Sequence, residues 1–158
     1  MDEMKLVPVD LSHIDIIYEW ANEEETRKNA FHTEKIEYST HQQWMKNKLA
    51  DPDSLFYLCD MGDTHVGQIR LDISGQQGLI SYSIDKSQRG KGYGKRMLLL
   101  LESELQQNTG CSDNVKELIA RVKYGNVPSQ KCFEKLGYKK IELSDYIEYQ
   151  KNIAKLVD

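Results

Sequence analysis

Short runs in which apolar and polar residues alternate recur along the chain, and turn-forming residues separate them. Alternation with a period of two is typical of a β-strand that buries one face. Glycine and aspartate lie between the three central runs and predict hairpins there. The pattern predicts strands at residues 5–9, 55–59, 66–73, 79–84 and 118–122, and a closing hairpin at residues 139–143 and 146–152.

Four other segments carry apolar residues at intervals of three and four, the period of a helix with one buried face. The first follows Ser12, a suitable N-cap, and the second ends before Pro52. Pro128 suits the first turn of the last helix, and Gly137 suits its end. Residues 23–38 lack this period and are predicted to form a loop, with at most one helical turn. The predicted helices cover residues 14–21, 40–50, 93–107 and 128–136.

The order of the predicted elements is β-α-α-β-β-β-α-β-α-β-β. Strands 79–84 and 118–122 are expected to lie parallel, because a helix crosses over between them. We therefore expect an α/β fold with a mixed β-sheet and helices on both faces. The chain has 158 residues, 39% apolar and 29% charged, which is enough for one hydrophobic core. No linker or repeat divides it, so a single domain is expected over residues 1–158.

Charge and composition exclude several classes of protein. The net charge of −4 argues against general nucleic-acid binding, which requires a basic face. No apolar run approaches the ~20 residues that span a membrane, and no signal-peptide pattern opens the chain. The three cysteines form no Cys-x-x-Cys pair and suit a reducing compartment, so we expect a cytoplasmic protein. The four histidines lack the spacing of metal ligands, and no metal site is predicted.

The stretch at residues 87–96, Ser-Gln-Arg-Gly-Lys-Gly-Tyr-Gly-Lys-Arg, connects a predicted strand to a predicted helix. Its glycines allow backbone N–H groups to approach a ligand closely. Its basic residues stand at a helix N-terminus, where they oppose the helix dipole unless an anion is bound. We interpret the stretch as a phosphate-binding loop, with a glycine-rich turn before a solvated basic helix end as the alternative. The Walker pattern does not fit, because Arg96 follows Lys95, and neither does the dinucleotide fingerprint.

Two segments resemble motifs of a known enzyme family. Arg89-Gly90-Lys91-Gly92-Tyr93-Gly94 is similar to the Arg/Gln-x-x-Gly-x-Gly/Ala pyrophosphate loop of the GNAT family of N-acetyltransferases. The segment at residues 126–138 is similar to the family's Asn-x-x-Ser/Ala…Glu-Lys-x-Gly-Phe/Tyr segment, and the predicted element order is also that of the family. The resemblance covers nearly the whole chain. It implies a GNAT-type fold and acetyl coenzyme A (acetyl-CoA) as the cosubstrate.

The resemblance also implies roles for individual residues. Backbone N–H groups of the loop would bind the pyrophosphate, and the end of the preceding strand would pair with the pantetheine arm and polarise the acetyl carbonyl. Asn126 would reach the pantetheine or a water beside it, with helix capping as the alternative. Ser129 would lie near the thiol, and Lys131 near the adenosine. The implied cofactor-binding residues are Tyr82, Ser83, Ile84, Arg89, Gly90, Lys91, Gly92, Tyr93, Gly94, Lys95, Asn126, Ser129 and Lys131.

Two positions depart from the family pattern. Many members carry a tyrosine seven residues after the asparagine, which protonates the departing thiolate; here that residue is Phe133. Some carry a glutamate base five residues before the asparagine; here that residue is Arg121. Relatives that acetylate ribosomal proteins also lack the tyrosine, and there a serine can serve as the proton donor. The resemblance therefore implies Ser129 as the catalytic residue.

The N-terminal half resembles acetyltransferases that act on nucleotide-linked amino sugars of surface glycans and, less closely, those that act on protein N-termini. The residues that carry this likeness are 19–22, Arg27 and Trp44. A site without an obvious base suits an amine of low pKa. At pH 7 deprotonation costs about 1.4 kcal/mol for an α-amine near pKa 8 and about 4.6 kcal/mol for a lysine amine. We expect direct transfer to a small-molecule amine, an amino-sugar nucleotide first and a protein N-terminus second.

Some alternatives stay open at this point. Water, Asp72, His32 or Glu37 could relay the proton of the acceptor. Trp20 and Trp44 belong either to the acceptor wall or to the core. A non-catalytic acyl-CoA-binding module is the competing class, because the usual acid and base are both replaced. The sequence also leaves open whether the chain forms a homodimer.

Overall fold

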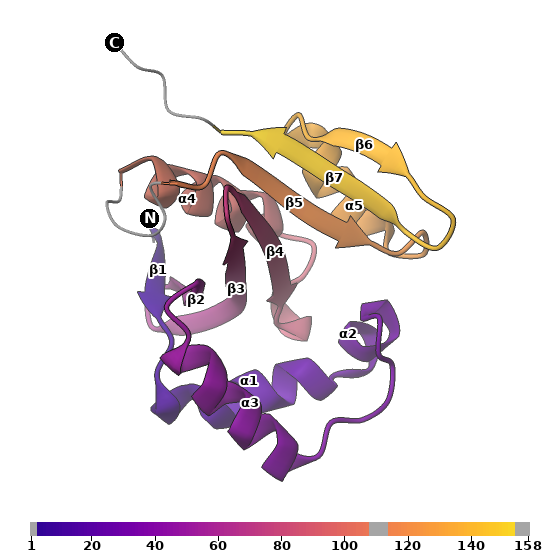
Figure 1. Cartoon of the computed structure of the whole chain (residues 1–158). Helices are drawn as coiled ribbons and strands as arrows, with labels where there is room; N and C mark the ends of the chain where they lie inside the picture. The colour runs from indigo at the N-terminus through magenta and orange to yellow at the C-terminus, as the bar shows by residue number, and fades with distance from the viewer. Residues whose placement is uncertain (1–2, 108–113, 154–158) are drawn as a thin grey trace.

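The computed structural model describes residues 3–107 and 114–153, and a seven-stranded sheet forms its centre (Figure 1). The strands, in their order across the sheet, are β1 (Met4–Pro8), β2 (Ser54–Met61), β3 (Thr64–Ser74), β4 (Gln77–Ile84), β5 (Glu117–Val122), β7 (Ile147–Asn152) and β6 (Lys139–Glu142). Neighbouring strands are antiparallel except β4 and β5, which are parallel as predicted. The strand β7 lies between β5 and β6, so the closing hairpin adds to the sheet through its second strand.

Helices cover both faces of the sheet (Figure 1). They are α1 (Ile14–Asn22), α2 (Glu24–Asn29), α3 (Tyr38–Ala50), α4 (Tyr93–Gln107) and α5 (Val127–Lys135). The helices α4 and α5 bury their apolar residues against the main core, which includes the inner faces of β4 and β5. The helices α1 and α3 pack on the other face, over a second core cluster that includes residues of β2. None of the helices in the described ranges is long and apolar enough to cross a membrane.

The first helix begins at residue 14 as predicted, but the structure corrects the expected cap, which belongs to a 3-10 turn before the helix. Asp10, and not Ser12, is the capping residue: its carboxylate accepts a hydrogen bond from the Ser12 N–H at 2.9 Å. His13 completes this cap, because its Nδ1 accepts from the Asp10 N–H at 3.0 Å. A 3-10 turn at Leu11–His13 then leads into α1. Aspartate and serine are equally good N-caps, so composition alone does not choose between neighbouring candidates.

The segment at residues 23–38 contains more helix than predicted. The helix α2 occupies six of these residues, and the Glu23 carboxylate caps it by accepting from the N–H groups of Glu25 and Thr26 at 2.9 and 3.3 Å. The helix α2 has no buried face, so its sequence does not show the apolar period by which the other helices were predicted. Residues 108–114 form a polar stretch that predicts a loop, and most of this stretch lies outside the described residues.

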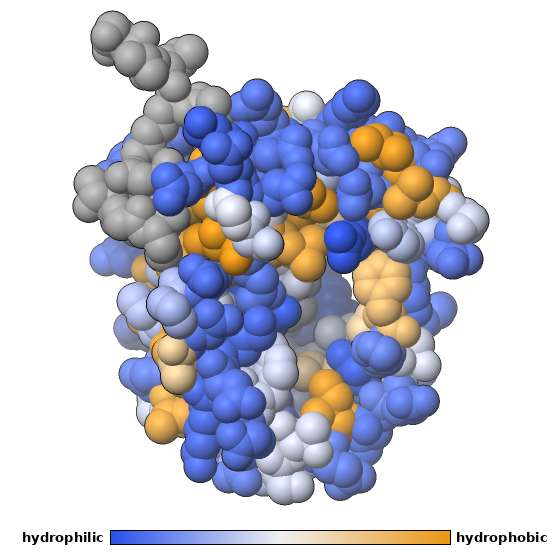
Figure 2. All heavy atoms as spheres, viewed as in Figure 1, coloured by the Kyte–Doolittle hydropathy of each residue, from blue (hydrophilic) through white to orange (hydrophobic). Residues whose placement is uncertain are grey.

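The strands β4 and β5 are joined over only part of their length. Residues 77–79 of β4 pair with residues 117–119 of β5, and no further pair joins the two strands in the described part of the chain. The strand β5 continues to pair with β7 as far as Val122 and Ile147. Figure 1 shows β4 and β5 diverging from this point. The facing edges of the two strands separate beyond residue 79, and the space-filling view in Figure 2 shows a hollow there, which we call the opening; the ends of both strands lie at its mouth.

Candidate active site

The loop between β4 and α4 is anchored by the carboxylate of Asp85. It accepts hydrogen bonds from the Ser87 N–H at 2.9 Å and from the Trp20 indole N–H at 2.7 Å. The bonds from Ser87, helped by the one from Trp20, lower the pKa of Asp85 although its burial opposes this. Trp20 is 6% exposed, and Trp44 packs edge-to-face on Phe56 at 5.9 Å. Trp20 therefore belongs to the core and also positions the loop, whereas Trp44 is half-buried and packs against the second core cluster.

The centre of the loop has a backbone conformation that favours glycine. Gly90 and Gly92 have φ of +81° and +79°, and an added Cβ at either would meet no atom within 4 Å. Conformation, and not crowding, is therefore the reason for glycine here. Such turns direct successive N–H groups into an anion-binding concavity. The first α4 bond joins the Arg96 N–H to the Gly92 carbonyl at 3.4 Å, so the N–H groups of residues 93–95 have no acceptor within the helix.

Gly94 is required for a different reason. It is buried, and an added Cβ would lie 3.3 Å from Cys132 Sγ on α5 and 3.4 Å from the Tyr82 ring on β4. The missing side chain lets the first turn of α4 pack closely on both elements. The loop, the end of β4 and the start of α5 are therefore brought together at one place.

The basic side chains of the loop have different surroundings. Arg89 forms an ion pair with Glu23 of 2.5 Å and donates to the Ile84 carbonyl at 3.2 Å. Burial alone would raise the pKa of Glu23, but hydrogen bonds from Arg89 and from backbone N–H groups lower it to about 2. Arg89 therefore ties the loop to α2. Lys91 and Lys95 are exposed and add positive charge around the concavity.

The predicted pantetheine-binding residues lie along the opening. Tyr82, Ser83 and Ile84 follow the last β4 residue that pairs with β5. The Ser83 hydroxyl accepts from Gln68 Nε2 at 3.0 Å. A Cβ at Gly67 of β3 would lie only 2.4 Å from the Ser83 carbonyl oxygen, so glycine is needed where β3 passes β4. Within the described residues, the β5-facing edge of β4 has no strand partner here, which leaves its backbone groups available to a ligand.

The first turn of α5 places Asn126 and Ser129 next to the end of β4. Asn126 Oδ1 accepts from the Ser129 N–H at 3.3 Å, so the capping alternative holds for Asn126. The Ser129 hydroxyl is not used in this cap; it forms a hydrogen bond of 2.9 Å with the Tyr82 hydroxyl. This side-chain role of Tyr82 has no signal in the sequence, because the two residues are 47 positions apart. Lys131 is exposed on the same helix.

The structure shows what surrounds Phe133 and Arg121, the two residues that depart from the family pattern. Phe133 is 1% exposed, stacks on Tyr149 at 5.3 Å between ring centroids, and meets Tyr82 edge-to-face at 6.0 Å. It is a core residue without an acidic proton. Arg121 extends from β5 and pairs with Glu148 of β7 at 3.4 Å. The positions of the usual acid and base therefore provide neither group.

Of the three residues considered as proton relays, Asp72 is the least suited. Its carboxylate binds Lys48 Nζ at 2.7 Å and Arg70 Nε at 2.9 Å. Burial alone would raise the pKa of Asp72, but these two partners lower it. A carboxylate with a lowered pKa is a weak general base. His32 and Glu37 are exposed in the segment that connects α2 to α3.

A group of apolar and aromatic residues, which the sequence interpretation missed, lies at the end of the sheet where β5 ends and β7 begins. We call it the rim; it consists of the exposed Phe31, Tyr124 and Leu143 and the half-buried Tyr146. Phe31 is 52% exposed and meets Tyr146 edge-to-face at 5.4 Å. The Tyr124 hydroxyl donates to the Leu143 carbonyl. Tyr124 follows β5 and Tyr146 precedes its partner β7, so these loops reach the same end of the sheet. Figure 2 shows a hollow beside the end of β4, between α1 and α2 on one side and β5 and β7 on the other.

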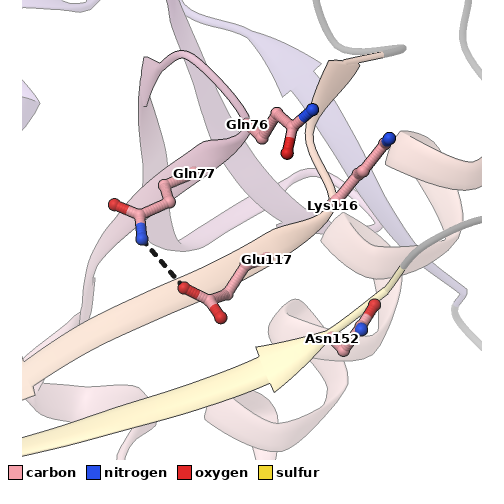
Figure 3. Close-up of a pocket in the computed structure, with 5 residues that line it drawn as sticks. All are labelled: Gln76, Gln77, Lys116, Glu117 and Asn152. Atoms are coloured by element: carbon pink, nitrogen blue, oxygen red, sulfur yellow. Dashed lines mark hydrogen bonds between the residues drawn. The ribbon is translucent and has the colours of Figure 1, made fainter.

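A polar pocket of about 330 Å³ lies elsewhere, at the closed end of the β4–β5 pair (Figure 3). The Gln77 amide donates to Glu117 there at 3.0 Å. This pocket is separated from the glycine loop by the length of β4, and it is not part of the site. The lining residues are Gln76, Gln77, Lys116, Glu117 and Asn152.

Comparison with known proteins identifies the family. A model of the acetyltransferase (GNAT) family matches residues 14–138, a range that includes the glycine loop and the first turn of α5. The chain belongs to the GNAT family. It is therefore an acetyl-CoA-dependent N-acetyltransferase, as the two motifs predict, and acetyl-CoA is its cosubstrate.

Individual GNAT relatives are distant in sequence. An N-acetyltransferase 9-like protein of Nematostella vectensis is 26% identical over 172 residues, which cover 91% of this chain and 78% of the relative. The spermidine N-acetyltransferase of Vibrio cholerae, solved with CoA and spermine, has a TM-score of 0.82 at 13% identity, with 96% of each chain covered. An acetyltransferase of Salmonella typhimurium that modifies the N-terminal serine of a ribosomal protein has a TM-score of 0.77 at 12% identity, with 94% of each chain covered. These two structures share the fold of this chain.

Proposed function

We propose that this GNAT enzyme transfers acetyl directly to a primary amine of low pKa, with both substrates meeting at the opening between β4 and β5. The observation that supports this most is the joint position of the positive-φ glycines, the α4 N-terminus and the unpaired edge of β4. The N–H groups of residues 90–95 would hold the pyrophosphate, and the backbone of residues 82–84 would hold the pantetheine arm. Acetyl-CoA supplies an acetyl thioester, and an N–H of the β4 edge would donate to its carbonyl oxygen.

Ser129 is the proposed donor to the leaving sulfur. Its hydroxyl is free of the helix cap and lies beside the end of β4, where it meets the Tyr82 hydroxyl. It also stands in the first turn of α5, where the helix dipole favours negative charge. Both features would stabilise a thiolate there. The amine loses one proton and the sulfur gains one, so the protein supplies no net proton.

The preference for a low-pKa amine rests on the carboxylates around the site. Glu23, Asp72 and Glu148 are each ion-paired with a basic side chain. Partners of this kind hold the pKa of Glu23 and of Asp72 low, so neither is a good base near pH 7. An amine that meets no base on the enzyme has to arrive neutral, which costs about 1.4 kcal/mol near pKa 8 but about 4.6 kcal/mol near pKa 10.4. Paired carboxylates are also poor partners for a polycation such as spermidine.

A protein N-terminus is the acceptor class that the mouth of the opening supports best. The rim of Phe31, Tyr124, Leu143 and Tyr146 is apolar and aromatic, and it would pack against the side chains that follow an α-amine. The solved relative that modifies a ribosomal-protein N-terminus shares the fold. The ordering of acceptors expected from the sequence alone is therefore reversed in this proposal.

An amino-sugar nucleotide remains the second candidate, because one observation favours it. Lys123 Nζ donates to the Lys28 carbonyl at 3.2 Å, which brings the side chain of one lysine to the backbone of another beside the mouth. Positive charge at this position would suit the diphosphate of a sugar nucleotide. Aromatic side chains of the rim would pack on the sugar ring in that case.

Thiol release from acetyl-CoA in the presence of a panel of amines tests the proposal. The panel holds peptides with a free α-amine, the same peptides with a blocked N-terminus and one lysine, an amino-sugar nucleotide, and spermidine. We expect the largest kcat/KM with a free α-amine. A larger kcat/KM with the lysine peptide or spermidine would contradict the low-pKa argument. Tight CoA binding without turnover of any amine in the panel would contradict the proposed acceptor classes.

A further inference from the structure

A tyrosine from another element lies beside the position of the missing family tyrosine. Phe133 has no hydroxyl, but Tyr82 of β4 reaches across its ring, edge-to-face at 6.0 Å, and ends at the Ser129 hydroxyl at 2.9 Å. The half-buried Tyr82 side chain lies beside Gly94 of α4, where an added Cβ would be 3.4 Å from its ring, and it interacts with Cys132 of α5. A phenol is therefore held against the serine that the proposed function assigns to the leaving sulfur.

We propose that Tyr82 is a positioning residue that donates its hydroxyl hydrogen to Ser129 Oγ and so directs the hydrogen of Ser129 toward the leaving sulfur of coenzyme A. This inference rests on the proposed role of Ser129. A serine hydroxyl has one hydrogen and two lone pairs. Once a lone pair accepts from Tyr82, the hydrogen of Ser129 is free for another acceptor.

Two features of the surroundings suit Tyr82 as the donor in this bond, in which the geometry allows either hydroxyl to donate. Burial raises the pKa of Tyr82 and the neighbouring Cys132 raises it further, although the bond with Ser129 opposes this, so the phenol keeps a proton that it can donate. The backbone of Ser129 is fixed from the other side, because its N–H binds Asn126 Oδ1 at 3.3 Å. The cap and the phenol together hold the serine in one orientation. The proton that the amine loses balances the one that the sulfur gains, so Ser129 and Tyr82 end each turnover with the hydrogens they had before.

The phenylalanine variant of Tyr82 tests this role, because it keeps the ring and removes only the hydroxyl. We expect Tyr82→Phe to lower kcat about tenfold and Ser129→Ala to lower it at least as much, with the KM for acetyl-CoA unchanged in both. Because Tyr82 acts through Ser129, the double variant should have the kcat of Ser129→Ala alone. Tyr149→Phe is the matched control: it also removes a buried hydroxyl beside Phe133, in this case one bonded to Glu134, and should leave kcat unchanged.

A second measurement needs no acceptor and therefore separates this inference from the proposed function. The ultraviolet absorbance of the thiolate, followed against pH, gives the pKa of the bound coenzyme A thiol. A hydrogen bond from Ser129 stabilises the thiolate, so we expect this pKa to rise in both Ser129→Ala and Tyr82→Phe and to stay unchanged in Tyr149→Phe. A rise in Ser129→Ala alone, with wild-type kcat in Tyr82→Phe, would overturn the role of Tyr82. An unchanged thiol pKa in Ser129→Ala would overturn the roles of both residues.

Discussion

Replacing Gly92 by alanine isolates the backbone conformation at the centre of the phosphate-binding loop. Gly92 has a φ of +79°, and an added Cβ would have no neighbour within 4 Å. The cost is therefore that of holding an L-residue in the left-handed region, roughly 1–2 kcal/mol. A loop that relaxes to avoid this cost moves its N–H groups away from the phosphates. We expect the affinity for coenzyme A to fall by the corresponding factor of about 5 to 30.

Titration calorimetry with coenzyme A measures this affinity, and thermal unfolding measures stability. Gly75→Ala is the matched control, because Gly75 has a φ of +60°, an equally open Cβ position, and a place in the β3–β4 turn at the far end of β4. It should lose similar stability and bind coenzyme A like the wild type. An affinity of Gly92→Ala within about twofold of wild type would refute the role of the loop. An equal loss of affinity in Gly75→Ala would refute the explanation by local strain.

Three further predictions concern the surroundings of the loop. Gly94→Ala should lower the melting temperature, because its Cβ would lie 3.3 Å from Cys132 Sγ, and adding Cys132→Ala should restore it. The Glu23–Arg89 pair should contribute stability that is present above the ordinary Glu23 pKa of 4.5 and lost as pH falls toward 2; Glu23→Gln should remove this part of the pH dependence of the unfolding free energy. Lys91→Ala should cost about 0.3–1 kcal/mol of coenzyme A binding free energy at low salt and less at high salt, as calorimetry at two ionic strengths will measure.

Local patterns in the sequence were sufficient for most of the fold. Alternation located the strands, and the apolar period located α4 and its start at residue 93, because each of these elements buries one face. The parallel pairing of β4 and β5 followed from the crossover helix. The divergence of these two strands after residue 79 could not be predicted, because where two strands stop pairing depends on how all the strands and helices pack together. The helix α2 was underestimated, since a cap from Glu23 stabilises it instead of an apolar face.

The site was predictable only where its chemistry lies in one stretch of chain. The glycine loop was predicted from the spacing of its glycines, and the positive φ of Gly90 and Gly92 explains why glycine stands at these two positions. The contacts that hold the loop in place could not be predicted, because they join residues far apart in the sequence. Trp20, for example, donates to Asp85, which is 65 positions away. No pattern within either segment signals such a contact. The exposed rim at the mouth was missed for the same reason, since it combines three separate connecting segments.

The central claim is that the enzyme uses an acceptor amine that is already neutral. The most direct test is the pH dependence of kcat/KM for two peptides, one with an α-amine near pKa 8 and one with only a lysine amine near pKa 10.4. If the claim is right, the inflection of each profile follows the pKa of its own acceptor. If both profiles inflect at the same pH, a group of the enzyme removes the proton, and the account of the acceptor site is wrong.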